Sequence, residues 1–90
     1  MELIYKSEAL ADIEYWKASG QKAIQKKISV LLAEIAEHPT TGTGKPELLK
    51  RDLAGCWSRR INDEHRLVYE IDYGNNTVNI LSMRGHYYKK

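Results

Sequence analysis

The fold is decided by the stretch Trp57-Ser58-Arg59-Arg60-Ile61-Asn62-Asp63-Glu64-His65-Arg66-Leu67-Val68-Tyr69. Aromatic and β-branched residues on both sides of the polar turn Asn62-Asp63-Glu64 predict two antiparallel strands, over residues 56–61 and 65–71. Side chains alternate along a strand. In the second strand one face therefore takes His65, Leu67, Tyr69 and Ile71, and the other takes Arg66, Val68 and Glu70. We expect Arg66 to project away from the more apolar face.

Further strands are predicted on either side of this pair in the sequence. A third, over residues 77–84, follows the turn Asp72-Tyr73-Gly74-Asn75-Asn76, and the run Leu3-Ile4-Tyr5 suits a short first strand. The loop Thr40-Thr41-Gly42-Thr43-Gly44-Lys45-Pro46 is rich in small and turn-forming residues. It separates a helical first half from a β-rich second half.

Two helices are predicted between the first strand and that loop. In the first, Ser7 offers an N-cap and Gly20 marks the end, and the buried stripe consists of Leu10, Ile13 and Trp16. The second ends before Pro39, and its apolar face consists of Ile24, Ile28, Leu31, Leu32 and Ile35. A short connection makes the two a helical hairpin. The predicted fold class is α+β, with an N-terminal strand and a helical hairpin packed on a small, mostly antiparallel sheet.

Length and composition set the broad class of protein. The chain has 90 residues, of which 42% are hydrophobic and 29% charged, and this suits one domain over residues 1–90. It shows no run of about 20 apolar residues and no secretory signal, so we expect no membrane segment and a cytoplasmic location. Cys56 is the only cysteine, which excludes an intramolecular disulfide and suits packing better than nucleophilic chemistry.

Positive charge is concentrated in the second half of the chain. Residues 1–44 carry five Lys and six Asp or Glu, whereas residues 45–90 carry nine Lys or Arg and six Asp or Glu. The excess accompanies the arginines of the opening stretch and the later run Arg84-Gly85-His86-Tyr87-Tyr88. This clustering favours an anionic partner, with nucleic acid first among the candidates.

The residues around these arginines include candidates for cutting RNA without a metal ion. Attack of a 2′-hydroxyl on the neighbouring phosphate needs a base, a group that neutralises charge on the phosphate, and an acid for the leaving oxygen. The candidates for these roles, in that order, are Glu47, Arg66 and His86. The three histidines and one cysteine have no metal-ligand spacing, so we expect neither a metal nor a cofactor.

Each candidate also has a purely structural interpretation. Glu47 follows Pro46 and suits the start of a turn, while His86 suits an ordinary surface position near the chain end. A solvated sheet face, or pairing with nearby acids, accounts equally well for Arg59, Arg60 and Arg66. Residue types alone leave both interpretations open.

Several strings along the chain occur together, in the same order and spacing, in one known family. They are Gly44-Lys45-Pro46-Glu47-Leu48-Leu49-Lys50, Leu53-Ala54-Gly55-Cys56-Trp57-Ser58-Arg59-Arg60-Ile61, Glu64-His65-Arg66-Leu67-Val68-Tyr69, His86-Tyr87 and, on the first helix, Tyr15-Trp16. On these strings the chain resembles the YoeB (Txe/YoeB) toxins, within the RelE/ParE-like superfamily of bacterial type II toxin–antitoxin systems. The resemblance spans nearly the whole chain and implies a RelE-like microbial RNase-type fold.

The resemblance implies a ribosome-dependent endoribonuclease, an mRNA interferase that cuts mRNA in the ribosomal A site and so inhibits translation. By matching position, the catalytic residues are the proposed base Glu47, the phosphate stabiliser Arg66, the proposed acid His86 and the adjacent aromatic Tyr87. Further active-site positions fall on Arg60 and Glu64, and RNA contacts on Lys50 and Arg59.

The same resemblance implies partners. These are the ribosome and mRNA, and a cognate antitoxin of the YefM or Axe type that is short, acidic and partly disordered, with a homodimer as a further expectation. Two alternatives stay open. One is a non-catalytic toxin of the ParE-like branch that acts on DNA gyrase, and the other is a basic module that binds RNA without cutting it.

Overall fold

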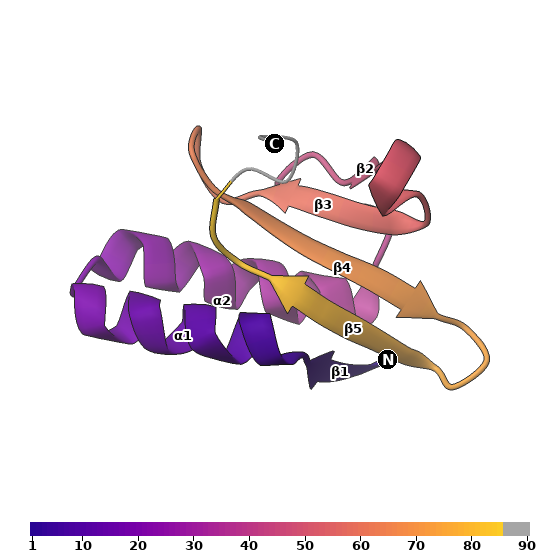
Figure 1. Ribbon diagram of the computed structural model, residues 1–90, viewed down its shortest axis with the longest axis horizontal. Helices are drawn as coiled ribbons and strands as arrows, with labels where there is room; N and C mark the ends of the chain where they lie inside the picture. The colour runs from indigo at the N-terminus through magenta and orange to yellow at the C-terminus, as the bar shows by residue number, and fades with distance from the viewer. Residues whose placement is uncertain (86–90) are drawn as a thin grey trace.

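Two helices cover one face of a five-stranded sheet in the computed structural model, which describes residues 1–85 (Figure 1). The elements in chain order are β1 (Glu2–Tyr5), α1 (Ser7–Ser19), α2 (Lys22–Glu37), β2 (Glu47–Leu48), the 3-10 helix η1 (Arg51–Leu53), β3 (Cys56–Arg60), β4 (Arg66–Asp72) and β5 (Thr77–Ser82). The strand order is β1-β5-β4-β3-β2, with β1 parallel to β5 and the other pairs antiparallel. The predicted α+β class is confirmed.

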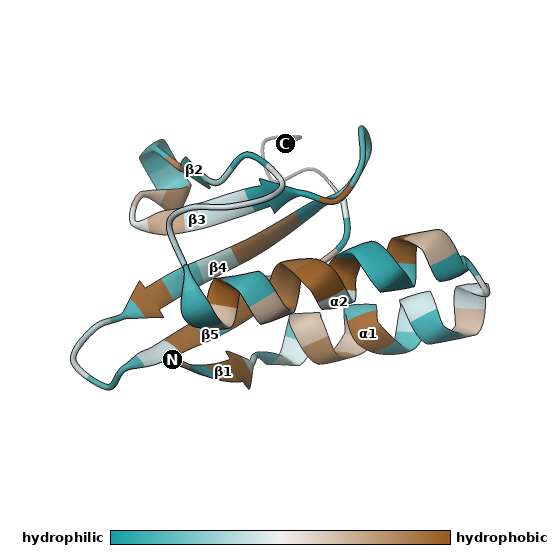
Figure 2. Ribbon diagram, turned by 180° about the vertical axis from the view of Figure 1, so that it is seen from behind, coloured by the Kyte–Doolittle hydropathy of each residue, from teal (hydrophilic) through white to brown (hydrophobic). Residues whose placement is uncertain are grey.

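The core lies between the helices and the sheet. Helix α2 buries the stripe predicted from its periodicity, at Ile28, Leu31 and Ile35. The sheet contributes residues that alternate on its helix-facing side, namely Leu67, Tyr69, Val78 and Ile80. Figure 2, seen from behind, shows α2 lying across the strands with hydrophobic residues along its length. Among the described residues, no helix is long and apolar enough to span a membrane.

Helix α1 differs in two details from the sequence prediction. Ser7 is its first helical residue rather than its N-cap, which is Lys6 and makes no side-chain capping bond. The predicted burial of Leu10 is wrong, because Leu10 is 53% exposed. The buried residues are Ala9, Asp12 and Trp16. Packing against the end of β5 selects this face, and a shift of one residue turns a helix by about 100°. The predicted end at Gly20 is confirmed, in the left-handed conformation with φ 71°.

Strand β2 and helix η1 were not predicted as elements. A strand of two residues has no periodicity to detect, and β2 exists because it pairs with β3, placing Glu47 opposite Ser58. The chain then turns back, and Leu49 donates its N–H to the carbonyl of Cys56 at 2.8 Å. The returning segment forms a small second cluster on the sheet face away from the helices, made by Leu49, Leu53, Cys56, Val68 and Leu81. This cluster covers one end of that face.

Candidate active site

Three predicted site residues share the sheet face opposite the helices, which we call the helix-free face. The strand register pairs Glu47 with Ser58, Ser58 with Val68, and Arg60 with Arg66. Side chains directly opposite in neighbouring strands lie on the same face, and so do residues two apart in one strand. Glu47, Arg60 and Arg66 therefore project from one side of the sheet, as alternation predicted for Arg66.

The side chain of Arg66 is held by the turn that precedes it. Its Nη1 donates hydrogen bonds to the carbonyl oxygens of Asn62, at 2.7 Å, and His65, at 3.2 Å, and the residue is only 9% exposed. The turn is ordered by Asn62, whose Oδ1 accepts the N–H groups of Glu64 and His65 at 2.9 and 2.8 Å. The turn at Asn62 was predicted but this role of its side chain was not, although Asn at the start of a turn is the usual signal for this geometry. It fixes the direction of the guanidinium.

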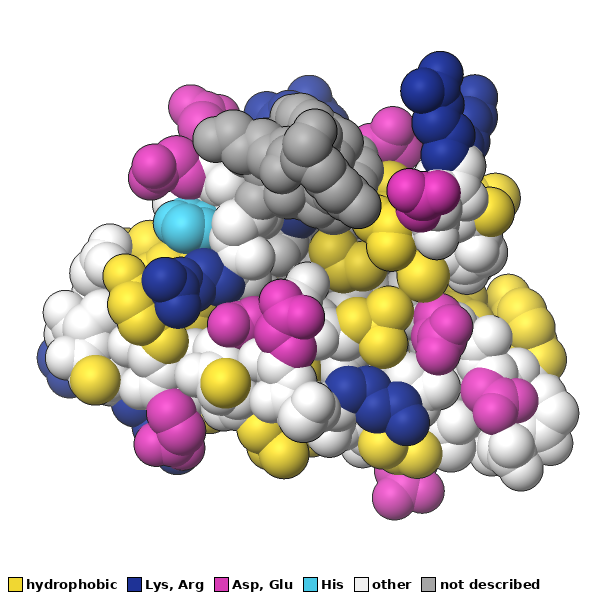
Figure 3. Space-filling model, viewed as in Figure 1, with side chains coloured by type: hydrophobic (Ala, Val, Ile, Leu, Met, Phe, Trp, Pro, Cys, Tyr) yellow, Lys and Arg dark blue, Asp and Glu magenta, His cyan; other side chains and the backbone are white. Residues whose placement is uncertain are grey.

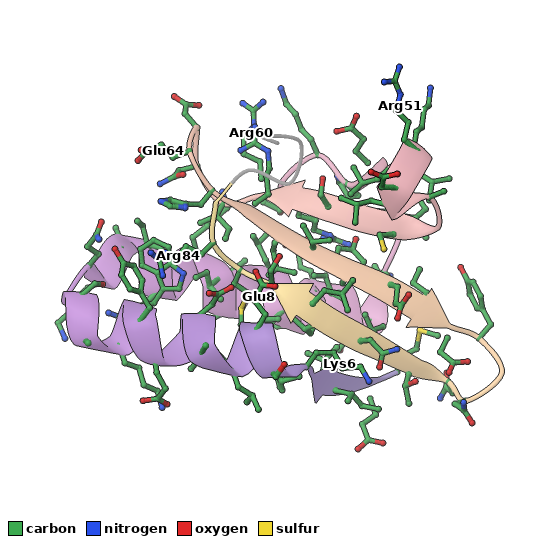
Figure 4. The ribbon with its side chains drawn as sticks, in the orientation of Figure 1. Lys6, Glu8, Arg51, Arg60, Glu64 and Arg84 are labelled. Carbon is green, nitrogen blue, oxygen red and sulfur yellow. The ribbon has the colours of Figure 1, made fainter. Side chains whose placement is uncertain are left out.

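Arg60 and Glu64 lie at the exposed edge of the same region. The Arg60 side chain is 46% exposed, and its Nη1 lies 3.8 Å from Oδ1 of Asp63. Exposed ion pairs of this kind are weak, so a phosphate can replace the carboxylate as the partner of Arg60. Glu64 extends from the turn between β3 and β4 (Figure 4). Figure 3 shows charged side chains of both signs gathered along this edge of the molecule.

The pairing of Arg60 with Arg66 sets two like charges directly opposite each other. Opposed Cβ atoms of an antiparallel pair lie about 4.5–5.5 Å apart, and like charges in that position are destabilising. A bound anion removes the repulsion, because guanidinium groups bind phosphate oxygens through paired N–H donors. Glu47 lies diagonally from Arg60 across the β2–β3 pair, and such neighbours are about 7–8 Å apart with their Cβ atoms somewhat closer. A carboxylate thus borders a pair of cations whose donors suit an anion.

Arg59 does not fit the RNA contact predicted for it. Alternation places Arg59 on the helix side of β3, and the residue has no exposed surface. Its guanidinium donates to the Tyr69 hydroxyl at 3.1 Å and to a carboxylate oxygen of Glu34 at 3.3 Å. It also donates to three main-chain carbonyls of the loop after α2, those of His38, Thr41 and Thr43. Because these bonds occupy it inside the protein, we correct its role to anchoring that loop.

The anchored loop leads directly to Glu47. Glu34 accepts the N–H of Thr43 at 2.7 Å and its hydroxyl at 2.8 Å. The pKa of the Glu34 carboxyl is held below its usual value. The hydrogen bond from the Thr43 main chain contributes most, followed by that from the Thr43 hydroxyl and by the nearby Arg59 guanidinium. At the end of the loop, the carbonyl of Gly44 accepts the N–H of Arg60 at 2.7 Å. The path from α2 to β2 is therefore bonded to the sheet just before Glu47, and Lys50 follows at an exposed position.

His86 and Tyr87 lie outside the described residues. The last described residue, Gly85, accepts the main-chain N–H of Arg66 at 3.0 Å and donates its own N–H to Nδ1 of His65 at 2.8 Å. The bond from Gly85 to residue 86 therefore starts beside the first residue of β4. This brings the attachment point of the predicted acid next to the predicted phosphate stabiliser.

Two other features lie apart from these residues. A hollow of about 190 Å³ opens between α1 and α2 and is lined mainly by apolar side chains, among them Ile13, Trp16 and Leu32. It lies on the opposite side of the sheet from Glu47 and Arg60. Within residues 1–85, no three His, Cys, Asp or Glu side chains gather so that they could hold a metal ion.

The fold is that of small bacterial toxins. A YoeB/ParE toxin from Agrobacterium tumefaciens superposes with a TM-score of 0.89 at 37% sequence identity, over 97% of this chain and 100% of that one. YoeB from Staphylococcus aureus, solved in a heterotetrameric complex with YefM and also as a dimer, superposes with a TM-score of 0.82 at 41% identity, over 97% of this chain and 98% of that one. Fold and shared sequence together define a toxin of the RelE-like class.

Sequence comparison narrows the class to a family. The model of the family described as "YoeB-like toxin of bacterial type II toxin-antitoxin system" matches residues 5–87. Toxin YoeB of Escherichia coli (strain K12) is 44% identical over 87 residues, which are 97% of this chain and 100% of that protein. The chain belongs to the YoeB-like family of toxins of type II toxin–antitoxin systems, and the resemblance seen in its sequence is confirmed.

Proposed function

We propose that this toxin is a ribosome-dependent endoribonuclease that cuts mRNA in the ribosomal A site and thereby inhibits translation. The observation that carries the proposal is the like-charged pair Arg60 and Arg66, which shares the helix-free face with Glu47. Like charges opposed in this way are destabilising and the exposed ion pair of Arg60 with Asp63 is weak, whereas an RNA backbone supplies phosphates at a regular spacing. Family membership supports the same activity.

The proposed reaction is a transesterification that needs no metal ion. Glu47 takes the proton of a 2′-hydroxyl, whose oxygen attacks the adjacent phosphorus. Arg66, already oriented by Asn62, stabilises the negative charge that grows on the phosphate oxygens. His86 gives its proton to the 5′-oxygen as the P–O bond breaks, with Tyr87 beside it. The products are a 2′,3′-cyclic phosphate and a 5′-hydroxyl end.

Three further residues are proposed to lie at the bound RNA. Arg60 and Lys50 are exposed cations at the border of the site, and they bind neighbouring phosphates. Glu64, at the tip of the β3–β4 turn, is a further active-site position. Arg59 acts from the core by holding the loop that leads to Glu47, and residues 1–90 form a single toxin domain in this proposal.

The test maps the 5′ ends of mRNA on programmed ribosomes, with purified toxin and its variants. We expect Glu47→Gln and His86→Gln to reduce the cleavage rate by roughly 10²–10⁴-fold, the usual contribution of a general acid or base. Glu37→Gln, which removes an exposed carboxylate at the end of α2, is the matched control and should cleave like the wild type. Wild-type rates in both the Glu47 and His86 variants would rule out the mechanism.

A second assay on the same preparations tests the alternative target, DNA gyrase. A toxin of the ParE-like branch inhibits supercoiling and leaves translation intact, whereas the proposed enzyme inhibits translation and leaves supercoiling intact. A basic module without catalysis binds RNA in a salt-dependent manner and produces no new 5′ ends. Inhibited supercoiling with normal translation would replace the proposal with the gyrase alternative.

We also propose a YefM-like antitoxin as the partner and the cytoplasm, where ribosomes and mRNA occur, as the location. The Staphylococcus aureus relative forms a heterotetrameric complex with YefM and has also been solved as a dimer. Coexpression of the toxin with the neighbouring antitoxin gene should yield a complex that copurifies, and light scattering on the free toxin should give the mass of a dimer. Failure to copurify would overturn the proposed antitoxin partner, and a monomer mass would overturn the proposed dimer.

A further inference from the structure

The segment that follows β5 is fastened to helix α1. Met83 donates its N–H to Oδ2 of Asp12 at 2.8 Å, and its carbonyl accepts Nε1–H of Trp16 at 2.9 Å. Asp12 and Trp16 are four residues apart, so they lie on the same helix face one turn from each other. Met83, Asp12 and Trp16 are all buried. Both main-chain groups of one residue are thus bound by two side chains of one helix face.

Two residues later the chain is fastened again, this time to the start of β4. Gly85 donates its N–H to Nδ1 of His65 and accepts the N–H of Arg66, so consecutive residues bind its two main-chain groups. The ring of His65 packs edge-on against Trp16, with centroids 4.9 Å apart and planes at 86°. This contact joins the two attachments into one unit.

The residue between the two attachments also contacts α1. The guanidinium carbon of Arg84 lies 3.7 Å from the centroid of the Tyr15 ring, and Figure 4 shows Arg84 above this helix. Residues 83–85 are therefore held at every position, immediately before His86.

We propose that His65 is a positioning residue for cleavage, which fixes Gly85, the residue that precedes His86 in the sequence, by accepting its N–H at Nδ1. The inference rests on the proposed nuclease function. Arg66 donates its N–H to the carbonyl of the same glycine. Gly85, which precedes the proposed acid, is therefore hydrogen-bonded to the residue that is proposed to stabilise the phosphate. Nδ1 thus serves as the acceptor for Gly85, while Nε2, on the other side of the ring, lies 3.9 Å from Oε1 of Glu64.

Two substitutions separate the acceptor from the ring. His65→Asn places Oδ1 near the position of Nδ1 and keeps an acceptor for Gly85, but loses the packing on Trp16. His65→Phe keeps a ring against Trp16 and removes the acceptor. We expect the Phe variant to lose roughly 10–100-fold in kcat, because small misplacement of a catalytic group is enough for such a loss. Its KM for programmed ribosomes should stay at the wild-type value, and the Asn variant should recover most of kcat.

A measurement without substrate tests the contact itself. In ¹H–¹⁵N spectra of the free toxin, we expect an unprotonated Nδ1 at His65 and a hydrogen-bonded Gly85 amide that exchanges slowly. The amide should exchange faster in the Phe variant and stay protected in the Asn variant. Urea unfolding of all three proteins verifies that each is folded under the assay conditions.

The outcomes distinguish this inference from the proposed function. If the wild-type toxin cuts mRNA and His65→Phe retains its kcat, or if His65→Phe and His65→Asn lose kcat equally, the positioning role is overturned and the nuclease stands. A protonated Nδ1 overturns it as well. If the wild type cuts no mRNA, the proposed function is overturned, and the catalytic role of His65 falls with it; the Gly85 exchange rates still decide whether His65 holds that residue.

Discussion

Truncation of Arg59 to alanine should destabilise the fold rather than only weaken RNA binding. The substitution removes the donors for the carbonyls of His38, Thr41 and Thr43, and for the hydroxyl of Tyr69, in a site without exposed surface. Loss of one partner in a buried charged network typically costs about 3–5 kcal/mol. Since small domains have about 5–15 kcal/mol of total stability, this is a large fraction of what holds the protein folded.

Urea unfolding followed by circular dichroism measures the effect. With a slope of about 2 kcal/mol per molar urea, a loss of about 4 kcal/mol lowers the midpoint by roughly 2 M. Arg60→Ala is the matched control, because it removes the same side chain one residue away, where that side chain is 46% exposed. The control should shift the midpoint little and should still reduce cleavage. A loss below about 1 kcal/mol in Arg59→Ala, with an unchanged slope, would refute the anchoring role.

Three further predictions concern single groups. Hydrogen bonds from Thr43 and the charge of Arg59 lower the pKa of Glu34 from 4.5. The ionised carboxylate therefore stabilises the fold above pH 4.5, and this contribution is lost as the pH falls through the lowered pKa. Between pH 6 and pH 3 the wild type should lose more unfolding free energy than Glu34→Gln, and parallel losses contradict this. Burial raises the pKa of the Cys56 thiol, so a thiol reagent at pH 8 should react slowly with native protein and quickly in urea, and a fast native reaction contradicts this. Gly42→Ala should lower the urea midpoint more than Gly20→Ala. A Cβ at Gly42 (φ 120°) meets Oε1 of Glu34, whereas a Cβ at Gly20 meets open space. Equal shifts of the midpoint contradict this.

Much of the architecture follows from short-range pattern. The apolar spacing in α2 and the turn between two β-rich runs were predicted correctly, because both depend on residues close in sequence. Helix α1 was placed correctly and Trp16 was correctly predicted to be buried, but Leu10 was wrongly included in the buried face and Asp12 was overlooked. Asp12 is buried because it accepts the N–H of Met83, which is 71 residues away, and no local pattern encodes that contact.

The candidate site divides in the same way. Alternation along β4 placed Arg66 on the helix-free face, and the same rule applied to β3 puts Arg59 with Trp57 on the helix side. That signal was available in the sequence, but the RNA contact was assigned to Arg59 from the family resemblance. The register of β2 against β3, which brings Glu47 to the face of Arg60, depends on a two-residue strand and on an anchored loop. Neither feature has a periodicity that a sequence can display.

The sequence by itself determined the family of this protein, its helices and its hairpin, because ordered strings and local periodicities are properties of neighbouring residues. Only the tertiary structure decided which charged residues face solvent and which support the fold. Arg59 is the clearest case, since its main-chain acceptors lie 16 to 21 residues away along the chain. Burial of a charge is possible only where folding brings enough acceptors together, and that condition is set by the whole fold.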